Sequence, residues 1–260
     1  MDKFLNKIIH GDCLELMKSI EDQSIDMILA DLPYGTTACK WDSIIPFQPL
    51  WEQYERIIKD NGAIVLTASQ PFTSALIMSN PNLFKYEWIW DKVTPTGHTV
   101  AKLRPMQLHE SIVVFSKGTT ANRSKNNMLY NPQDLVPFGK VLDGARQAKE
   151  NYQNQYRRPS QNKKYVQEFT NYPKTILRFP KQPSKESIHP TQKPVALFEY
   201  LISTYTQKGM LVLDNCIGSG TTAVAALNTG RFFIGMEKEK AYVDLANERI
   251  LNHKKQLSLL

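Results

Sequence analysis

The sequence predicts an α/β fold in which a mostly parallel sheet carries helices on both faces. Segments with strand and helix periodicity alternate through both ends of the chain, a pattern that is typical of parallel sheets. In the second half, a glycine-rich turn over residues 215–222 joins a buried strand to a helix. Between the two ends lies a basic segment, residues 117–188, which we interpret as an insertion into the fold.

The amino-terminal part of the chain predicts alternating strands and helices. In order, the expected elements are a strand at Lys7–His10, a helix at about Leu14–Ile20, a strand at Ile25–Ala30, a helix at Gln48–Lys59, a strand at Ala63–Ala68, a helical stretch from Pro71 to Met78, and strands at Tyr86–Trp90 and Ser111–Ser116. Asp12 is a suitable N-cap for the first helix, and Asn61-Gly62 is expected to end the second. The connection from Lys92 to Gln107 is long and polar, which favours a functional loop.

The carboxyl-terminal part predicts a nucleotide-binding unit. Its expected elements are a helix at Pro194–Thr206, a strand at Met210–Asp214, a helix at Ala223–Asn228, a strand at Phe232–Met236 and a helix at about Ala241–Lys254. Gly218 and Gly220 let a ligand approach the backbone closely at the amino terminus of a helix. Glu237 follows the next strand, where a carboxylate can bind two ribose hydroxyls.

Composition excludes several classes of protein. With 260 residues, 42% of them hydrophobic, the chain can form one large α/β domain or two small ones. No apolar stretch approaches a membrane span, and the first residues lack the core of a signal peptide, so we expect a cytoplasmic protein without membrane contact. Cys13, Cys39 and Cys216 are far apart, which indicates neither a disulfide framework nor a zinc site. His98 and His109 lack metal-ligand spacing, and no metal is expected.

The net charge of +7 is concentrated in one segment. Residues 117–188 contain 14 Lys or Arg and 5 Asp or Glu, a balance of +9 that leaves −2 for the rest of the chain. The same segment contains several tyrosines and many Asn and Gln side chains. Basic side chains bind phosphates, amides read base edges, and aromatic rings stack on exposed bases. The segment therefore favours contact with nucleic acid, and a solvated, partly disordered insertion is the alternative.

Four residues, Asp31-Leu32-Pro33-Tyr34, directly follow the predicted strand at 25–30. Asp31 can accept a hydrogen bond from an amino group, and the Leu32 carbonyl, held by the fixed φ of Pro33, can accept a second. Tyr34 can stack on the ring that carries this amino group. An ordinary turn after a strand is the alternative, because Asp and Pro are common turn residues.

Two nucleotide cofactors are compatible with the carboxyl-terminal unit. Gly218-x-Gly220-x-x-Ala223 fits the dinucleotide fingerprint of NAD-dependent dehydrogenases. However, only 23 residues follow Glu237, which is too few for the strands that would hold a second mononucleotide. S-adenosylmethionine needs one such unit, and its positively charged methionine portion suits a turn that contains Asp214 and no basic residue. These residues favour S-adenosylmethionine over NAD, and the order of the motifs along the chain bears on the choice.

Three motifs, taken in their order along the chain, resemble those of the β-class DNA amino-methyltransferases of bacteria and phages. They are Asp31-Leu32-Pro33-Tyr34, His189-Pro190-Thr191-Gln192-Lys193-Pro194, and Asp214-x-x-x-Gly218-Ser219-Gly220-Thr221-Thr222. The resemblance covers nearly the whole chain and implies a circularly permuted, Rossmann-like S-adenosylmethionine-dependent methyltransferase fold. It implies a catalytic half at 1–116, a target-recognition insertion at 117–188 and a cofactor-binding half at 189–260. One sheet would then be completed from both ends of the chain.

The resemblance also implies roles for individual residues. Asp31, Leu32, Pro33 and Tyr34 would hold the amino group of a nucleotide flipped out of double-stranded DNA, for direct methyl transfer without a covalent enzyme intermediate. The residues expected at the cofactor are Asp12, Cys13, Asp31, Thr191, Lys193, Asp214, Asn215, Cys216, Gly218, Ser219, Gly220, Thr221, Thr222 and Glu237. The residues expected at DNA are Trp41, His98, Lys102, Arg104, Arg123, Lys125, Arg157, Arg158, Lys163 and Lys164.

Within the cofactor set, the resemblance assigns Asp12 to the adenine amino group, Glu237 to the ribose and Lys193 to the methionine carboxylate. Asp12 can instead be only a helix N-cap. Two of the motifs depart from the common family pattern. Leu32 replaces a proline, and Asn215-Cys216 replaces a frequent Pro-Phe pair, which removes an aromatic ring that could pack against the cofactor.

Asp31 also bears on the substrate, because an aspartate there resembles the adenine methyltransferases, whereas serine is commoner in those that act on cytosine. We therefore expect methylation of adenine N6. Methylation of cytosine N4 is the alternative, and a catalytically silent DNA-binding protein is a third hypothesis from a different class. A homodimer and a cognate restriction endonuclease are left open as partners.

Overall fold

The computed structural model describes residues 2–35, 42–122, 124–143, 164–181 and 192–257. The chain divides into two compact units, of which unit 1 comprises Met1–Asn131 and Thr175–Leu260, and unit 2 comprises Pro132–Lys174. The elements are η1 (Asp2–Phe4), β1 (Lys7–His10), α1 (Cys13–Met17), β2 (Ile25–Asp31), α2 (Phe47–Ile57), β3 (Ile58–Ala68), α3 (Phe72–Ser79), β4 (Phe84–Thr96), η2 (His98–Val100), β5 (Gln107–Phe115), β6 (Val136–Asp143), β7 (Lys164–Thr170), β8 (Ile176–Arg178), α5 (Val195–Tyr205), β9 (Leu211–Asp214), α6 (Thr221–Asn228), β10 (Phe232–Glu237) and α7 (Lys240–Leu257).

The described part of unit 1 is built on an eight-stranded sheet with the order β1-β10-β9-β2-β3-β5-β4-β8. The first five strands of this order run parallel to one another. β5 is antiparallel to both of its neighbours, and β8 is parallel to β4. The predicted α/β class with a mostly parallel sheet is therefore confirmed.

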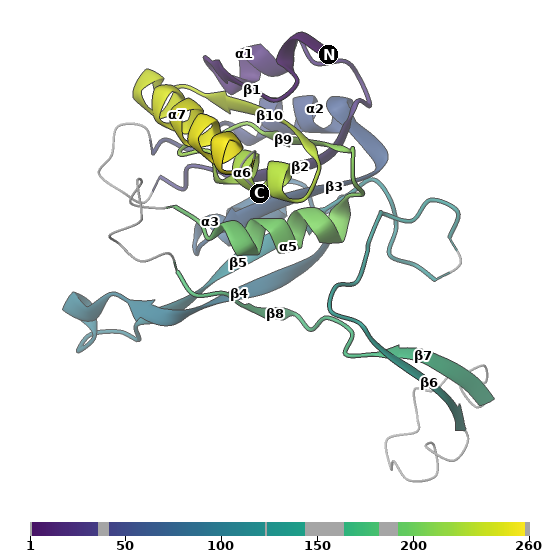
Figure 1. The fold of residues 1–260 in the computed structure, drawn as a ribbon. Coiled ribbons are helices and arrows are strands. Elements are labelled where there is room, and N and C mark those ends of the chain that lie inside the picture. The colour runs from purple at the N-terminus through teal and green to yellow at the C-terminus, as the bar shows by residue number, and fades with distance from the viewer. Residues whose placement is uncertain (1, 36–41, 123, 144–163, 182–191, 258–260) are drawn as a thin grey trace. The chain divides into compact units, whose positions relative to one another are not determined.

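The two ends of the chain complete the sheet together. β1 pairs with β10 in parallel, from Lys7 opposite Ile234 to His10 opposite Glu237. In Figure 1 the purple first strand lies beside the yellow-green last strand. This pairing confirms the circular permutation, because a strand from the amino terminus extends the nucleotide-binding unit of the carboxyl terminus.

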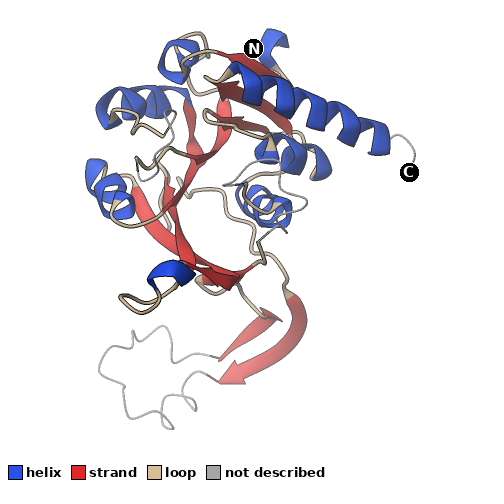
Figure 2. Cartoon of the chain, turned by 90° about the vertical axis from the view of Figure 1, so that its left-hand side faces the viewer, coloured by secondary structure: helices blue, strands red, loops and turns tan. Residues whose placement is uncertain are grey.

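Helices cover both faces of the sheet (Figure 2). One face packs against α1, α2 and α3 through buried residues that include Met17 and Leu76. The opposite face packs against α5, α6 and α7 through residues that include Leu201 and Ile250. Successive residues of β2 enter both layers, which explains why this strand forms a continuous apolar run in the sequence.

The predicted end of the second helix was wrong. α2 ends at Ile57, and the backbone of Ile58 is already extended, with φ −74° and ψ 137°. Asn61 and Gly62 therefore lie inside β3. A Cβ on Gly62 would lie 2.8 Å from the carbonyl oxygen of Asp26, so glycine permits the close approach of β2 at its register shift.

The expected long polar loop from Lys92 to Gln107 was also partly wrong. β4 continues to Thr96, and η2 covers His98–Val100, so that a strand end and a short helix occupy much of the segment. Lys92 is buried, with 2% of its surface exposed. The first helix is shorter than expected and ends at Met17, although Asp12 caps it as predicted by accepting a hydrogen bond from the Leu14 amide at 2.9 Å.

Unit 2 contains an antiparallel pair of strands, β6 and β7, within its described residues. Several large apolar side chains of this pair are exposed: Val136, Phe138, Val141, Tyr165 and Val166. The flanks of the predicted insertion belong to unit 1, since the Leu129 amide donates to the Asn61 carbonyl and β8 pairs with β4. The assignment of the insertion to target recognition stays a prediction.

Among the described residues, none of the helices combines the length and the apolar character that a membrane span needs.

Candidate active site

A cavity of about 1000 Å³ opens at the edge of the sheet where β2, β9 and β10 end. Its lining includes residues from the motif Asp31-Leu32-Pro33-Tyr34, from the glycine turn and from β4 and β5. A volume at the upper end of the usual range for ligand sites, ~300–1,000 Å³, leaves room for a nucleoside cofactor and a second small group. Parallel sheets bind ligands at this edge, outside the carboxyl ends of their strands.

Strand alternation places four polar side chains on one face of the sheet beside the cavity, namely those of Asp31, Thr67, Glu110 and Lys92. Asp31 pairs in register with Thr67, which in turn pairs with Ile112 on β5. Glu110 lies two residues before Ile112 and therefore on the same face. Because β5 is antiparallel, it begins at the edge where β2 and β3 end. Lys92 lies two residues after the residue of β4 that pairs with Glu110.

Asp31 accepts hydrogen bonds at both of its carboxylate oxygens. The Tyr34 hydroxyl donates to Oδ1 at 2.6 Å, and the Thr67 hydroxyl donates to the same oxygen. The Lys193 ammonium donates to Oδ2 at 2.7 Å. Each carboxylate oxygen can accept about two hydrogen bonds. The remaining acceptor position of Asp31 therefore lies on Oδ2.

The other residues of the motif at 31–34 line the cavity with Asp31. The Tyr34 ring stacks on Phe72, with ring centroids 5.2 Å apart. Burial, reinforced by the charge of Asp31, raises the pKa of Tyr34 well above its usual value, so its hydroxyl remains a donor. The side chain of Leu32 is buried in the core, which anchors the backbone between Asp31 and Pro33.

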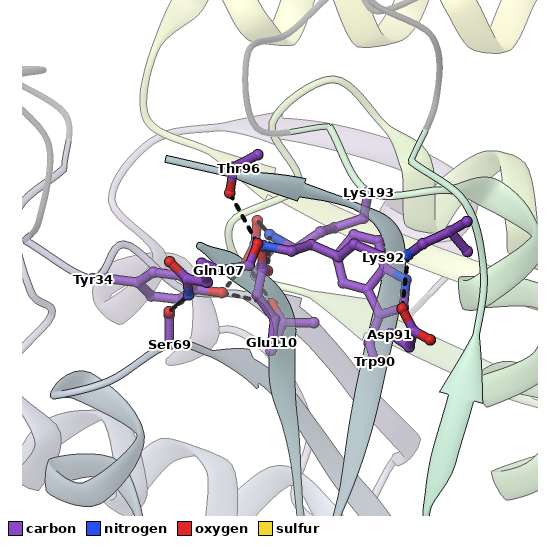
Figure 3. A network of polar contacts seen from close by, with 12 residues as sticks. Tyr34, Ser69, Trp90, Asp91, Lys92, Thr96, Gln107, Glu110 and Lys193 are labelled. Atoms are coloured by element: carbon purple, nitrogen blue, oxygen red, sulfur yellow. Dashed lines mark hydrogen bonds and ion pairs between the residues drawn. The ribbon is translucent and has the colours of Figure 1, made fainter. Parts of the chain in front are cut away.

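Lys193 is 7% exposed and contacts two carboxylates, Asp31 and, at 3.3 Å, Glu110. Glu110 also pairs with the buried Lys92 at 3.2 Å. Figure 3 shows this network between β4, β5 and the segment before α5. Burial alone would lower the pKa of Lys193, but Asp31 and the neighbouring groups raise it well above its usual value. The expected contact of Lys193 with the cofactor carboxylate stays a prediction.

The glycine turn has the backbone that its sequence predicts. Gly218 and Gly220 have φ values of 51° and 82°, in the left-handed region that favours glycine. A Cβ on Gly220 would also lie 3.1 Å from the Cβ of Ala246 on α7. Arg249 of α7 donates to the carbonyl of Ser219 at 2.9 Å and to the Thr221 hydroxyl at 3.2 Å. These hydrogen bonds connect the glycine turn to α7 and stabilise its conformation.

Asp214 ends β9 and is 3% exposed at the cavity. Its carboxylate accepts hydrogen bonds from the Cys216 amide at 3.0 Å and from the Thr222 hydroxyl. Burial raises the pKa of Asp214 from its usual 3.8 to about 7, although both hydrogen bonds favour the ionised form. Thr222 is fully buried, and its hydroxyl donates a hydrogen bond to the Asp214 carboxylate.

The raised pKa of Asp214 predicts a pH-dependent stability. Between about pH 4 and 7 the folded protein binds a proton that the unfolded chain releases, so the free energy of unfolding falls as the pH rises through this window. We expect the stability of Asp214→Asn relative to the wild type to be greater at pH 8 than at pH 5, by on the order of 2–3 kcal/mol, because much of the cost of ionising Asp214 in the folded protein is absent at the lower pH. Thermal melts at both values measure this difference. A relative stability that is the same at both would show that Asp214 does not titrate in this window.

Two acidic residues line the same end of the cavity as the glycine turn. Glu237 accepts hydrogen bonds from the Gly218 amide at Oε2 and the Glu239 amide at Oε1, both at 2.9 Å. Asp12 is half exposed and caps α1 while it lines the cavity, so capping and ligand binding are compatible. Together with Asp214, these carboxylates suit a cofactor with a ribose, an amino-bearing base and a positive charge. The residues present therefore fit S-adenosylmethionine.

Asn215 and Cys216, which depart from the family pattern, form a polar cluster. The Tyr54 hydroxyl donates to Asn215 Oδ1 at 2.5 Å. The Asn215 amide donates to the sulfur atoms of Cys13 and Cys216, each at 3.5 Å. Asn215 thus joins the start of α1 to the turn after β9, next to Cys216, the position at which the resemblance implies an aromatic ring.

The residues expected at DNA divide into two groups. His98, Lys102, Arg104, Lys125 and Lys164 are described and exposed. Trp41, Arg123, Arg157, Arg158 and Lys163 lie outside the described residues, as does Thr191 of the cofactor set. Contact with DNA stays a prediction for both groups.

Sequence reasoning missed four residues that shape the site: Thr67, Lys92, Glu110 and Arg249. A signal existed for two of them, because Glu110 lies two residues before the apolar run at 112–115 and Lys92 lies two residues after the aromatic strand at 86–90. In the part of the chain that is described, no group of three or more His, Cys, Asp or Glu side chains is arranged to hold a metal ion.

Known proteins resemble this chain over most of its length. A family model described as DNA methylase matches residues 25–248. The Type II methyltransferases M2.MboI and M1.MboII of Moraxella bovis are each 29% identical to the chain, over 95% and 94% of it and over 88% and 95% of their own lengths. The Type II methyltransferase M.HinfI of Haemophilus influenzae is 27% identical over 96% of this chain and 69% of its own.

Solved structures share the fold. The M1.HpyAVI–SAM complex superposes with a TM-score of 0.61 at 25% identity and covers 94% of this chain and 98% of its own. The cytosine-N4-specific PvuII DNA methyltransferase gives a TM-score of 0.63 at 16% identity, with 96% and 91% covered. The second similarity concerns the fold alone.

Proposed function

The chain belongs to the DNA methylase family of N6 and N4 amino-methyltransferases, and we propose that it methylates the N6 amino group of adenine at a specific sequence in double-stranded DNA. Membership of the family makes it a DNA methyltransferase that uses S-adenosylmethionine. The choice of adenine, the specific sequence and the roles of single residues are our proposals. We also propose that it is the modification enzyme of a type II restriction system, in line with the names of its relatives.

The observation that carries the proposal is the environment of Asp31. Its Oδ1 is occupied by two hydroxyl donors, and its Oδ2 retains an acceptor position beside the cavity. An exocyclic amino group supplies the N–H donor that this position requires. The aspartate itself supports adenine over cytosine, because serine is commoner at this position in the cytosine enzymes.

The chain's contribution to the reaction is to hold and orient the target base. S-adenosylmethionine supplies an activated methyl group on its sulfonium sulfur. Asp31 accepts one amino hydrogen and the Leu32 carbonyl accepts the other, which draws the nitrogen lone pair out of conjugation and directs it at the methyl group. Pro33 keeps this backbone rigid, and Tyr34 supports both Asp31 and the base. When the nitrogen bonds to the methyl carbon, the bond between that carbon and the sulfonium sulfur would break and leave its electron pair on sulfur. The nitrogen would then be cationic and would lose one proton to solvent.

The nucleotide must be flipped out of the duplex, because its amino group cannot reach the cavity while stacked. We assign sequence recognition to the insertion that includes unit 2. Its described strands expose aromatic and basic side chains such as Phe138, Lys140, Lys164 and Tyr165, which suit stacking and phosphate contact.

The proposed product can be identified directly. Unmethylated DNA is incubated with the protein and S-adenosylmethionine, digested to nucleosides and analysed by mass spectrometry. We expect N6-methyladenine. N4-methylcytosine as the only product would overturn the choice of adenine, and no methylated product from a protein that binds the cofactor would favour the silent DNA-binding protein.

A further inference from the structure

Glu110 connects two buried lysines to the catalytic aspartate. Its Oε1 accepts a hydrogen bond from Lys92 at 3.2 Å, and its Oε2 lies 3.3 Å from the ammonium of Lys193. The same ammonium lies 2.7 Å from Oδ2 of Asp31. Figure 3 shows Glu110 on β5 beneath Lys193, with Lys92 on the neighbouring strand. Neither the motifs of the sequence nor the resemblance assigned a role to Glu110 or Lys92.

The burial of these groups makes the arrangement energetically demanding. Lys92 is 2% exposed, and the Glu110 side chain is 15% exposed. A buried ammonium that loses its carboxylate is strongly destabilised. Burial alone would raise the pKa of Glu110, but the ammonium groups of Lys193 and Lys92 hold it below its usual value. Glu110 is therefore a fixed negative charge, and two carboxylates balance the two lysines.

Glu110 also controls where the Lys193 ammonium can lie. Lys193 precedes α5, which covers the face of the sheet that carries Asp31 and Glu110, and its ammonium lies at the end of a long side chain. Its backbone alone therefore does not fix the position of the ammonium on Asp31. The ammonium lies between two carboxylates: it donates a hydrogen bond to Asp31 and forms a longer ion pair with Oε2 of Glu110, an oxygen that accepts no hydrogen bond within the described residues. The ammonium then occupies one acceptor position on Oδ2 and leaves the other one directed at the cavity.

We propose that Glu110 is a positioning residue for methyl transfer, which holds Lys193 on Oδ2 of Asp31 and so keeps the carboxylate aimed at the target amino group. This inference rests on the proposed role of Asp31 as the acceptor of that amino group. A purely structural alternative exists, in which Glu110 serves only to neutralise the buried Lys92.

A double-mutant cycle separates the two roles. Glu110→Gln is compared with the wild type, and Glu110→Gln/Lys92→Met is compared with Lys92→Met. The measurements are the single-turnover methylation rate at saturating cofactor, the Kd for S-adenosylmethionine and the melting temperature. Glu87→Gln, on β4 and away from the network, is the control for loss of a glutamate charge in the same sheet.

We expect Glu110→Gln to lower the single-turnover rate by about 10²-fold in both backgrounds, because a catalytic group displaced by about 1 Å loses roughly that factor. The Kd for the cofactor should change little. A rate loss that disappears in the Lys92→Met background would overturn the proposal in favour of neutralisation. An unchanged rate, or a weaker cofactor affinity with an unchanged saturated rate, would overturn it as well.

The variant Glu110→Asp keeps the charge and so tests position even if Glu110→Gln does not fold. Its carboxylate is one methylene shorter and cannot reach both lysines with the same geometry, so we expect a reduced rate with a melting temperature near that of the wild type. A wild-type rate for Glu110→Asp would count against the proposal. If the wild-type protein itself methylates no DNA, the proposed function is refuted. This result differs from a failure of the Glu110 proposal, in which the wild type is active and the Glu110 variants keep its rate.

Discussion

Asp31→Asn is expected to lose methyl transfer by at least about 10³-fold while the protein remains folded. Two hydroxyl donors, from Tyr34 and Thr67, meet at Oδ1, so they will hold the carbonyl oxygen of the new amide at that position. The NH₂ group must then lie where Oδ2 was. There it faces the Lys193 ammonium and the incoming amino group, which are both donors. The variant thus places a hydrogen-bond donor, in place of an acceptor, opposite the amino group that is to be methylated.

A matched control lies on the same strand. Asp26 pairs with Lys59 at 2.6 Å and accepts a hydrogen bond from the Leu211 amide at 2.9 Å, at the end of β2 remote from the cavity. Asp26→Asn makes the same chemical change without touching the site and should retain the saturated methylation rate below its melting temperature. The test is single-turnover methylation with product detection. An Asp31→Asn variant that keeps more than about a tenth of the wild-type rate would refute the role of Asp31.

Local sequence signals predicted the parts of the site that belong to one segment of chain. Asp31 to Tyr34 and the turn from Asp214 to Gly220 each place their groups within a few residues of a strand end. The fold follows from the same strand ends, because parallel strands gather them at one edge. The order of the motifs then predicted the permutation, which the pairing of β1 with β10 confirms.

The rest of the site depends on strand order and direction, which the local pattern does not contain. Glu110 can share Lys193 with Asp31 only because β5 is antiparallel to β3. The first residues of β5 then lie at the edge of the sheet where β2 and β3 end. With β5 parallel, Glu110 would lie at the opposite edge. Gly62 is a second example of a residue whose role depends on strand packing. A glycine is required there because β2 approaches closely, and not because a helix ends.

Glu237→Gln is expected to weaken S-adenosylmethionine binding by roughly 10–100-fold, which corresponds to one charge-assisted hydrogen bond of about 1.5–3 kcal/mol. Both oxygens of Glu237 already accept backbone amides, from Gly218 and Glu239, and their remaining lone pairs suit the two ribose hydroxyls. Glutamine has a single carbonyl oxygen. One amide therefore loses its acceptor, and one hydroxyl faces an NH₂ group in place of a carboxylate oxygen.

The effect of Glu237→Gln should appear in affinity and not in the saturated rate, because in the proposed arrangement Glu237 binds the ribose hydroxyls and contacts neither the target amino group nor the sulfonium. Calorimetric titration of the cofactor measures the first quantity, and single-turnover methylation at saturating cofactor measures the second. Asp244→Asn removes an exposed charge from the following helix, α7, and is the control for charge alone. An unchanged Kd for Glu237→Gln would show that the ribose lies elsewhere. A large loss of rate at saturation would show that Glu237 acts through the glycine turn on the position of the methyl donor.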